Sequence, residues 1–205
     1  MSARVAVFRS GTPPNPRVFV SAPLPGDALA ILAARASVVV SETGQGLADP
    51  RFVDDCGSYD AIVTLLTDRV DADVLAKAAR LRVVANVAVG VDNVDLAACR
   101  TRGVVVTNTP GVLTEATADL AFGLLLAAAR RIGEGERLVR EGLFTGWTPT
   151  LLLGARVHGA TLGIVGLGRI GQAMARRGRG FGMRVLYAQP RALEPELDRA
   201  LGLKP

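Results

Sequence analysis

In Thr161-Leu-Gly-Ile-Val-Gly-Leu-Gly-Arg-Ile-Gly171, an apolar run passes directly into a glycine-rich turn, which makes this segment the most informative about the fold. Its residues Leu162–Val165 predict a short buried strand, and helical character follows over Arg169–Arg179. A second apolar run at Arg184–Ala188 predicts the next strand. Strand, glycine turn, helix and strand in this order are the context that a dinucleotide-binding turn requires.

The glycines of this turn each have a physical role in binding a pyrophosphate. Gly166 permits the tight turn, Gly168 lets the backbone approach the phosphates, and Gly171 lets the helix pack closely on the strand. Free N–H groups at the helix start, including those of Arg169 and Ile170, favour negative charge. We therefore predict a dinucleotide site here. The alternative is a strand-to-helix turn in an α/β protein that binds no nucleotide.

Composition and charge narrow the class of protein. The 205 residues are 49% hydrophobic, enough for one large or two small globular domains, and only 4% aromatic, which argues against a nucleic-acid partner. The longest apolar stretch, Leu120–Ala129, is too short to span a bilayer, and no secretory signal is visible. Cys56 and Cys99 are too few and too far apart for a disulfide framework or a metal site. We expect a soluble cytoplasmic protein without a metal or membrane partner.

In the first half of the chain, short apolar runs alternate with helical patterns. The runs are β-branched and nearly continuous, as is typical of strands buried on both faces of a parallel sheet. The alternation predicts an open α/β domain. Strands are expected at Arg17–Ser21, Ser37–Ser41, Ala61–Thr64, Arg82–Val87 and Val104–Thr107, and helices at Asp27–Arg35, Ala72–Ala79 and Val94–Thr101.

The middle of the chain predicts a long helix from Thr114 to about Arg131. Apolar residues lie on both of its sides, which is typical of a helix buried between layers or domains. Gly133 and Gly135 are expected to bend or interrupt it. Residues 142–159 predict a loop whose apolar side chains, Trp147 and Leu151–Leu153, pack on another surface such as a second copy of the chain.

Three segments in fixed order, together with a fourth between them, resemble one enzyme family. They are Ala85-Asn-Val-Ala-Val-Gly-Val-Asp-Asn-Val-Asp95, Val106-Thr-Asn-Thr-Pro-Gly-Val-Leu-Thr-Glu-Ala-Thr-Ala-Asp-Leu-Ala121 and the glycine turn, preceded by Trp147-Thr-Pro-Thr-Leu-Leu-Leu-Gly154. These motifs are similar to those of the D-isomer-specific 2-hydroxyacid dehydrogenases, and especially of the glyoxylate/hydroxypyruvate reductase branch.

This resemblance implies an NAD(P)-dependent oxidoreductase that reduces a small 2-keto acid to a D-2-hydroxy acid. It also implies a flavodoxin-like substrate domain at residues 17–107, after an N-terminal extension at 1–16, and an NAD(P)-binding domain at 108–205. Because a complete Rossmann domain has two βαβαβ halves, and little sequence follows Gly171, we expect this second domain to be partial.

The resemblance also assigns roles to particular residues. The backbone of Val89 and Gly90 would hold the substrate carboxylate, where a missing Cβ lets N–H groups approach an anion. An ordinary strand-to-helix turn is the alternative there. Thr117 would lie near the nicotinamide, and the loop around Trp147 would form the arm of a homodimer.

Two departures from the family pattern matter. Gln189 stands where an NAD-specific member carries an acid, and Arg191 follows, so we expect NADP to be preferred over NAD. The second departure is the absence of the family's catalytic arginine, glutamate and histidine. The single histidine, His158, precedes the first strand and so lies at the end opposite to the cofactor. We therefore predict no catalytic residue in these 205 residues and no turnover by them alone.

Two other functions remain open at this point. One is a non-catalytic protein that senses a dinucleotide or binds a partner with the same scaffold. The other is a truncated gene product with no function of its own.

Overall fold

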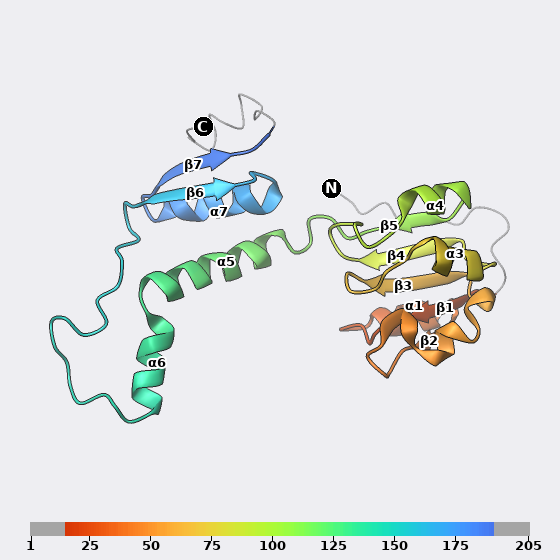
Figure 1. Cartoon of the computed structure of the whole chain (residues 1–205), viewed down its shortest axis with the longest axis horizontal. Helices are drawn as coiled ribbons and strands as arrows, with labels where there is room; N and C mark the ends of the chain where they lie inside the picture. Colours follow the sequence, from red (N-terminus) through yellow and green to blue (C-terminus); the bar gives the residue numbers. More distant parts are fainter. Residues whose placement is uncertain (1–14, 191–205) are drawn as a thin grey trace. The chain divides into compact units, whose positions relative to one another are not determined.

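The computed structural model describes residues 15–190, and they form two compact units (Figure 1). The first unit ends at Pro110 and the second begins at Gly111. Both contain parallel strands connected by helices, which confirms the predicted α/β class. No helix in the described part of the chain is long and apolar enough to cross a membrane.

The first unit is built on a five-stranded parallel sheet with the order β2-β1-β3-β4-β5. All five predicted strands and all three predicted helices are present, with ends that differ by one or two residues. The strands are β1 (Arg17–Val20), β2 (Ser37–Val40), β3 (Ala61–Leu65), β4 (Val83–Val87) and β5 (Val105–Thr107); the helices are α1 (Ala28–Ala33), α2 (Pro50–Val53), α3 (Ala72–Lys77) and α4 (Leu96–Thr101), with single 3-10 turns η1 (Gly46–Ala48) and η2 (Cys56–Ser58).

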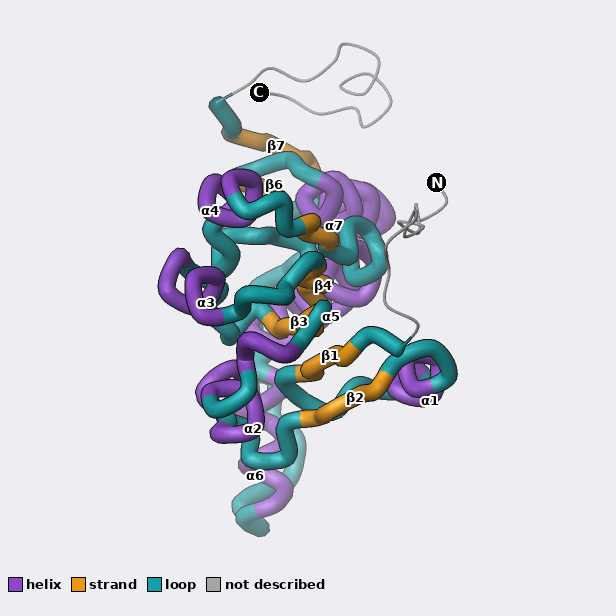
Figure 2. The backbone as a smooth tube through the Cα atoms, turned by 90° about the vertical axis from the view of Figure 1, so that its right-hand side faces the viewer, coloured by secondary structure: helices purple, strands orange, loops and turns teal. Residues whose placement is uncertain are grey.

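Helices cover the two faces of this sheet unequally. Helix α1 lies on one face, and α2, α3 and α4 lie on the other (Figure 2). The face with three helices holds the larger core, centred on Phe19, Ile62 and Leu75. The face with α1 alone leaves the β5 end of the sheet open, so that Val105 is 50% exposed. The prediction of strands buried on both faces is therefore wrong for this edge, because no described helix covers it.

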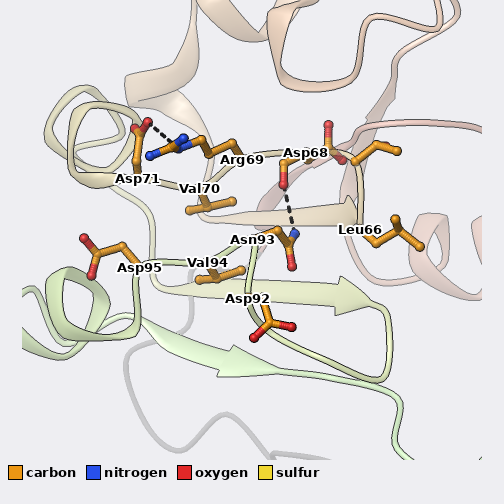
Figure 3. Close-up of a pocket in the computed structure, with 10 residues that line it drawn as sticks. Leu66, Asp68, Arg69, Val70, Asp71, Asp92, Asn93, Val94 and Asp95 are labelled. Carbon is orange, nitrogen blue, oxygen red and sulfur yellow. Dashed lines mark hydrogen bonds and ion pairs between the residues drawn. The ribbon is translucent and has the colours of Figure 1, made fainter.

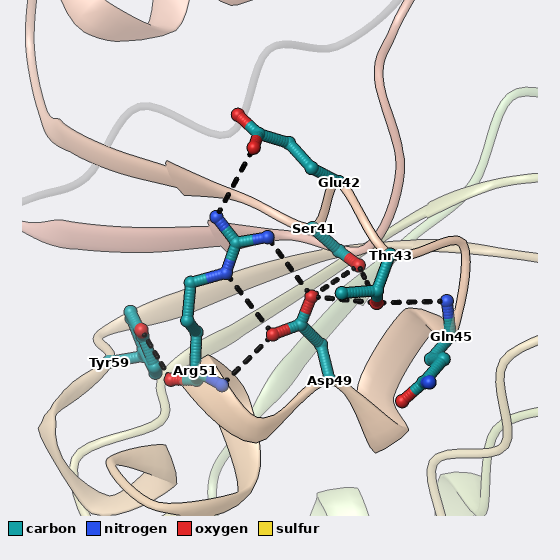
Figure 4. Close-up of polar contacts among 7 residues, drawn as sticks. All are labelled: Ser41, Glu42, Thr43, Gln45, Asp49, Arg51 and Tyr59. Atoms are coloured by element: carbon teal, nitrogen blue, oxygen red, sulfur yellow. Dashed lines mark hydrogen bonds and ion pairs between the residues drawn. The ribbon is translucent and has the colours of Figure 1, made fainter.

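Helix α2 was not predicted, although the pair Asp49-Pro50 carries its signal. Proline is favoured at the first helical position, and an aspartate before it caps the free N–H groups. The Asp49 carboxylate accepts a hydrogen bond from the Arg51 N–H at 2.9 Å and others from the Ser41 and Thr43 hydroxyls at 2.8 and 2.9 Å (Figure 4). The Arg51 guanidinium completes this buried site and holds the pKa of Asp49 well below its usual range.

The second unit contains a two-stranded parallel sheet and three helices. Strands β6 (Thr161–Val165) and β7 (Arg184–Ala188) pair with Leu162 opposite Val185, and helix α7 (Arg169–Gly180) connects them. This confirms the strand, helix and strand predicted around the glycine turn. Helices α5 (Thr114–Ala129) and α6 (Ile132–Arg140) precede them.

Helix α5 packs on α7 through an apolar contact and ion pairs. The Phe122 and Phe181 rings lie 4.9 Å apart between centroids. The Arg177 guanidinium hydrogen-bonds to the carboxylates of Glu115 and Asp119, and Arg176 also bonds Glu115 at 2.8 Å. The side of α5 that carries Phe122 therefore contacts α7 of the glycine motif through both an aromatic pair and ion pairs.

Two expectations about the middle of the chain are wrong. The long helix is interrupted at Arg131, which adopts a left-handed conformation with φ 56°, whereas Gly133 and Gly135 lie inside α6. Helix α5 is not buried on all sides, because Leu120 and Leu124 are 65% and 61% exposed. Only one side of α5 has a partner among the described residues, and the other apolar side faces outward.

The prediction of a buried strand at Leu162–Val165 is also only half right. Leu162 packs on Phe122, whereas Val165 is 93% exposed. The reason is that β6 has one strand beside it and one helix on it in residues 15–190, so its remaining surface is uncovered.

Candidate anion and dinucleotide sites

The predicted substrate residues lie in a loop at the carboxyl end of β4. Val89 and Gly90 follow this strand directly, and the loop continues through Asn93 before α4 begins. The carboxyl ends of β3 and β5 lie on either side of it in the sheet. Ligands of open α/β sheets bind at this edge, so the fold places the loop where a small substrate is expected.

Every backbone carbonyl from Ala88 to Val91 is held by a donor within the first unit. The Ala88 carbonyl accepts hydrogen bonds from the N–H and hydroxyl of Thr109 at 2.9 and 3.1 Å. The Val89 carbonyl accepts one from the Asn108 side chain at 2.7 Å. The Gly90 carbonyl accepts one from the Asn86 side chain at 3.0 Å, and the Val91 carbonyl accepts one from the Val94 N–H at 2.9 Å.

The N–H groups of this loop, unlike its carbonyls, lack hydrogen-bond partners among the described residues. Those of Val89, Gly90, Val91 and Asp92 have no acceptor within residues 15–190. In a planar trans peptide the carbonyl and the following N–H point in opposite directions. Because each of these carbonyls points toward its hydrogen-bond donor, the N–H of the same peptide points away from that donor. Four consecutive N–H groups are therefore available to an anion.

Gly90 brings no side chain into this loop. A Cβ added there would meet the exposed Asp92 carboxylate at 3.0 Å, and that side chain can move away. The backbone of Gly90 is not in a left-handed conformation, so neither space nor dihedral angles make a glycine obligatory at this position.

The cavity of about 440 Å³ beside the loop is not the anion site. Its wall carries the carboxylates of Asp71, Asp92 and Asp95, with Arg69 as its cation (Figure 3). The Arg69 guanidinium is already paired with Asp71 at 3.4 Å. Repulsion by the remaining carboxylates would disfavour a carboxylate substrate in this cavity.

The glycine turn has the geometry that phosphate binding requires. Gly166 has φ 89°, which a residue with a side chain rarely adopts. Gly168 precedes α7, and a Cβ added there would meet no atom within 4 Å, so the space in front of the helix is open. A Cβ on Gly171 would lie 2.3 Å from the Gly166 carbonyl oxygen. The conformations and surroundings of the three glycines thus differ from one another, and their roles in phosphate binding stay a prediction.

Free donors also line the start of α7. The N–H groups of Gly168, Arg169, Ile170 and Gly171 have no acceptor among the described residues. The helix that follows has 12 residues, and its dipole adds partial positive charge at this end. The turn can therefore bind a pyrophosphate with backbone donors alone.

The remaining predicted cofactor residues lie in different environments. Gln189 follows β7, and its Oε1 accepts a hydrogen bond from the Leu167 N–H at 3.1 Å, which ties it to the glycine turn. Thr117 is exposed near the start of α5, where its N–H bonds the Leu113 carbonyl. Arg191 lies outside the described residues.

His158 lies where the sequence places it. It is exposed and precedes β6 by three residues, at the amino end of that strand, whereas the glycine turn follows the carboxyl end. Its backbone carbonyl accepts a hydrogen bond from Arg156 at 3.1 Å, and its ring lies against Gly182.

Sequence reasoning missed the polar side chains that shape both sites. Asn86 and Asn93 hold the loop at 89–92, and Gln172 donates to the Leu167 carbonyl at 3.1 Å in the glycine turn. Asn86 carried a signal, since an amide in the apolar run Val83–Val87 is unusual for a buried strand. The partners of these side chains are distant in sequence and could not be assigned from it.

Comparisons with known proteins agree with this geometry. The family model of the D-isomer-specific 2-hydroxyacid dehydrogenase catalytic domain matches residues 18–192. A glyoxylate reductase of Korarchaeum cryptofilum is 55% identical over 153 residues, which cover 74% of this chain and 45% of that protein. A glyoxylate reductase of Thermococcus onnurineus is 44% identical over 192 residues, covering 92% and 57%. The chain thus spans about half the length of these relatives.

Solved structures show the same fold. The TT0316 protein of Thermus thermophilus is 48% identical with a TM-score of 0.79, over 86% of this chain and 58% of that one. An NAD-binding D-isomer-specific 2-hydroxyacid dehydrogenase of Polaromonas, described as putative, is 35% identical with a TM-score of 0.80, over 91% and 59%. The chain therefore belongs to the D-isomer-specific 2-hydroxyacid dehydrogenases, in the glyoxylate reductase branch.

Proposed function

We propose that the chain is the substrate domain and the first part of the dinucleotide domain of an NAD(P)-dependent reductase for small 2-keto acids such as glyoxylate or hydroxypyruvate. The observation that carries this proposal is the presence of two sets of free backbone donors, one in the loop at 89–92 and one at 168–171. One set suits a carboxylate and the other a pyrophosphate. The names of the relatives support the same reaction class.

A bound NAD(P)H would provide the hydride for reduction of the keto carbon of the substrate. The N–H groups of Val89 and Gly90 bind the substrate carboxylate and fix the orientation of the keto group. Gly166, Gly168 and Gly171, with the N–H groups of Arg169 and Ile170, bind the pyrophosphate. Thr117 lies near the nicotinamide in this proposal. The proton donor belongs to the part of the enzyme that the relatives have beyond the length of this chain.

Cofactor preference tests the dinucleotide site directly. We expect this chain to bind NADPH about tenfold to a hundredfold more tightly than NADH, because Gln189 is neutral and an arginine–phosphate pair with Arg191 contributes about 1–3 kcal/mol. Gln189→Asp should reverse the preference, and Arg191→Ala should reduce it. Fluorescence titration with both reduced cofactors measures the ratio.

Arg184→Ala is the matched control for this experiment. It removes the same charge from the exposed amino end of β7, away from the glycine turn, and should leave the ratio unchanged. Equal affinities in the parent chain, unaffected by either substitution, would show that neither residue contacts the ribose phosphate. Absence of binding by both cofactors would contradict the proposed function itself.

The arm at 142–159 is proposed to join two copies of the chain. Trp147 is 78% exposed and Leu153 is 65% exposed, whereas Leu152 lies against Gly135 of α6. We expect a dimer at micromolar concentration by sedimentation, and a monomer after Trp147→Ala with Leu153→Asp, since such interface residues contribute about 2–4 kcal/mol each. Ile31→Asp, at a 61% exposed position of α1, is the control and should remain dimeric. A monomeric parent chain would refute the arm as an interface.

A further inference from the structure

Two asparagine side chains, the buried Asn86 and the half-buried Asn93, form an amide pair next to the 89–92 loop. Asn86 lies on β4 and is 1% exposed. Its Nδ2 donates to Asn93 Oδ1 at 3.0 Å, and Asn93 Nδ2 donates back to Asn86 Oδ1 at 3.2 Å. A reciprocal pair of this kind fixes the orientation of both amides, because flipping either one would place like atoms face to face.

The remaining polar atoms of the pair are also satisfied. The Thr64 hydroxyl donates to Asn86 Oδ1 at 3.0 Å, and Asn86 Nδ2 donates to the Gly90 carbonyl at 3.0 Å. Asn93 Nδ2 has two hydrogens and three acceptors, which are Asn86 Oδ1 and the carbonyls of Leu65 and Asp68 at 3.1 and 2.9 Å, so one hydrogen is shared between two of them. The bond to the Asp68 carbonyl is drawn in Figure 3. The pair thus joins the loop after β4 to the loop after β3.

A polar network is an unusual way to fill the interior of a buried parallel strand. Apolar residues would stabilise a buried parallel strand without any need for hydrogen-bond partners, whereas each buried amide must be fully bonded to avoid a desolvation cost. A fully bonded network does, however, hold one conformation of the groups that it contacts. The group at its outer end is the Gly90 carbonyl.

Holding that carbonyl has a direct consequence for the loop. The Gly90–Val91 peptide is planar, so fixing its carbonyl toward Asn86 turns the Val91 N–H in the opposite direction. The Gly90 N–H is set in the same manner by the bond between Asn108 and the Val89 carbonyl. Without the Asn86 bond, the peptide after Gly90 could rotate and the N–H of Val91 would lose its orientation.

We infer that Asn86 and Asn93 are positioning residues, which hold the Gly90–Val91 peptide so that the loop presents its N–H groups to the substrate carboxylate. Neither side chain contacts the substrate. The inference rests on the proposed function of the loop, and it adds Val91 to the donors at Val89 and Gly90. It also explains why a polar pair lies between β3 and β4 at this edge of the sheet.

Oxalate, a two-carbon dicarboxylate, is the probe for this inference. In amide NMR spectra of the 205-residue chain, titration with oxalate should shift the signals of Val89, Gly90, Val91 and Asp92. Asn86→Ala should weaken oxalate binding about tenfold, the loss expected when one hydrogen bond that orders the donors is removed. The Val91 signal should also lose its oxalate response more than the Val89 signal does.

Thr64→Val is the matched control. It removes a buried hydrogen bond from the same network and is nearly isosteric, but it leaves the bond between Asn86 and the Gly90 carbonyl in place. Both variants should lower the melting temperature, whereas oxalate affinity should change less than about twofold in Thr64→Val. This separates positioning of the loop from a general loss of stability.

Each outcome bears on a different claim. A parent chain whose 89–92 signals do not respond to oxalate refutes the proposed carboxylate site, and the positioning role with it. Normal oxalate binding by the parent and equally by Asn86→Ala refutes the positioning role alone. If Asn86→Ala does not fold, Asn93→Ala at a half-buried position replaces it, and unchanged affinity in that variant overturns the inference.

Discussion

Purified residues 1–205 should show no reductase turnover with glyoxylate or hydroxypyruvate and either reduced cofactor. Reduction of a keto group requires a proton donor at the nascent alkoxide with a pKa near neutrality. The only histidine of the sequence, His158, is exposed at the amino end of β6, opposite to the glycine turn. Steady-state assays at high protein concentration measure this, and the expected loss relative to a complete enzyme is at least about a thousandfold.

A chimera supplies the positive control for this experiment. Residues 1–190 joined to the remaining part of the Korarchaeum cryptofilum glyoxylate reductase, of which the matched segment covers 45%, should regain turnover, because the family resemblance implies that the arginine, glutamate and histidine lie beyond the second strand of this domain. Activity of the 205-residue chain that disappears in His158→Ala would contradict the prediction. Failure of a folded chimera that binds cofactor would instead contradict the substrate-domain assignment.

Gly171→Ala should both destabilise the second unit and abolish cofactor binding. The added Cβ would lie 2.3 Å from the Gly166 carbonyl oxygen, a backbone atom that cannot move without opening the turn. Overpacking of this kind costs about 1–3 kcal/mol, and the displaced turn would lose its phosphate donors. Thermal unfolding with hydrogen exchange of β6 and α7 measures the first effect, and NADPH titration measures the second.

Two other glycine variants separate these effects. Gly168→Ala should leave stability nearly unchanged, since its Cβ meets no atom, but it should weaken NADPH binding by filling the space for the pyrophosphate. Gly178→Ala should change affinity little, because its Cβ meets a movable atom, Leu162 Cδ2, at 2.8 Å. Equal behaviour of all three variants would mean that the glycines do not have distinct roles.

The sequence predicted the regular elements well where periodicity and local chemistry decide them. The strands of the first unit and the β6-α7-β7 motif occur at the predicted places, since β-branched runs and glycine spacing act over a few residues. The break between α5 and α6 lies at Arg131 and not at Gly133 or Gly135, because Arg131 adopts a left-handed conformation and both glycines continue the helix α6. The start of α2 at Pro50 was overlooked, although its signal is local.

Burial was the property that local pattern predicted least well. Leu120 and Leu124 have the same apolar character as Phe122, yet they are exposed because no described element covers their side of α5. Val165 and Val105 are further cases, at the uncovered parts of their sheets. Hydrophobicity shows that a side chain favours a partner, but only the packed elements show whether one is present.

The family, the two motif loops and the position of His158 before β6 could be predicted from the sequence, because each depends on residue identity and spacing along the chain. How the Val89–Gly90 loop is held could be found only in the folded protein. Asn86 bonds Asn93 and Thr64, and Asn108 bonds Val89, through contacts between segments that meet only when parallel strands pair. Hydrogen bonds between such segments depend on distances of about 3 Å, and those distances exist only in the folded sheet.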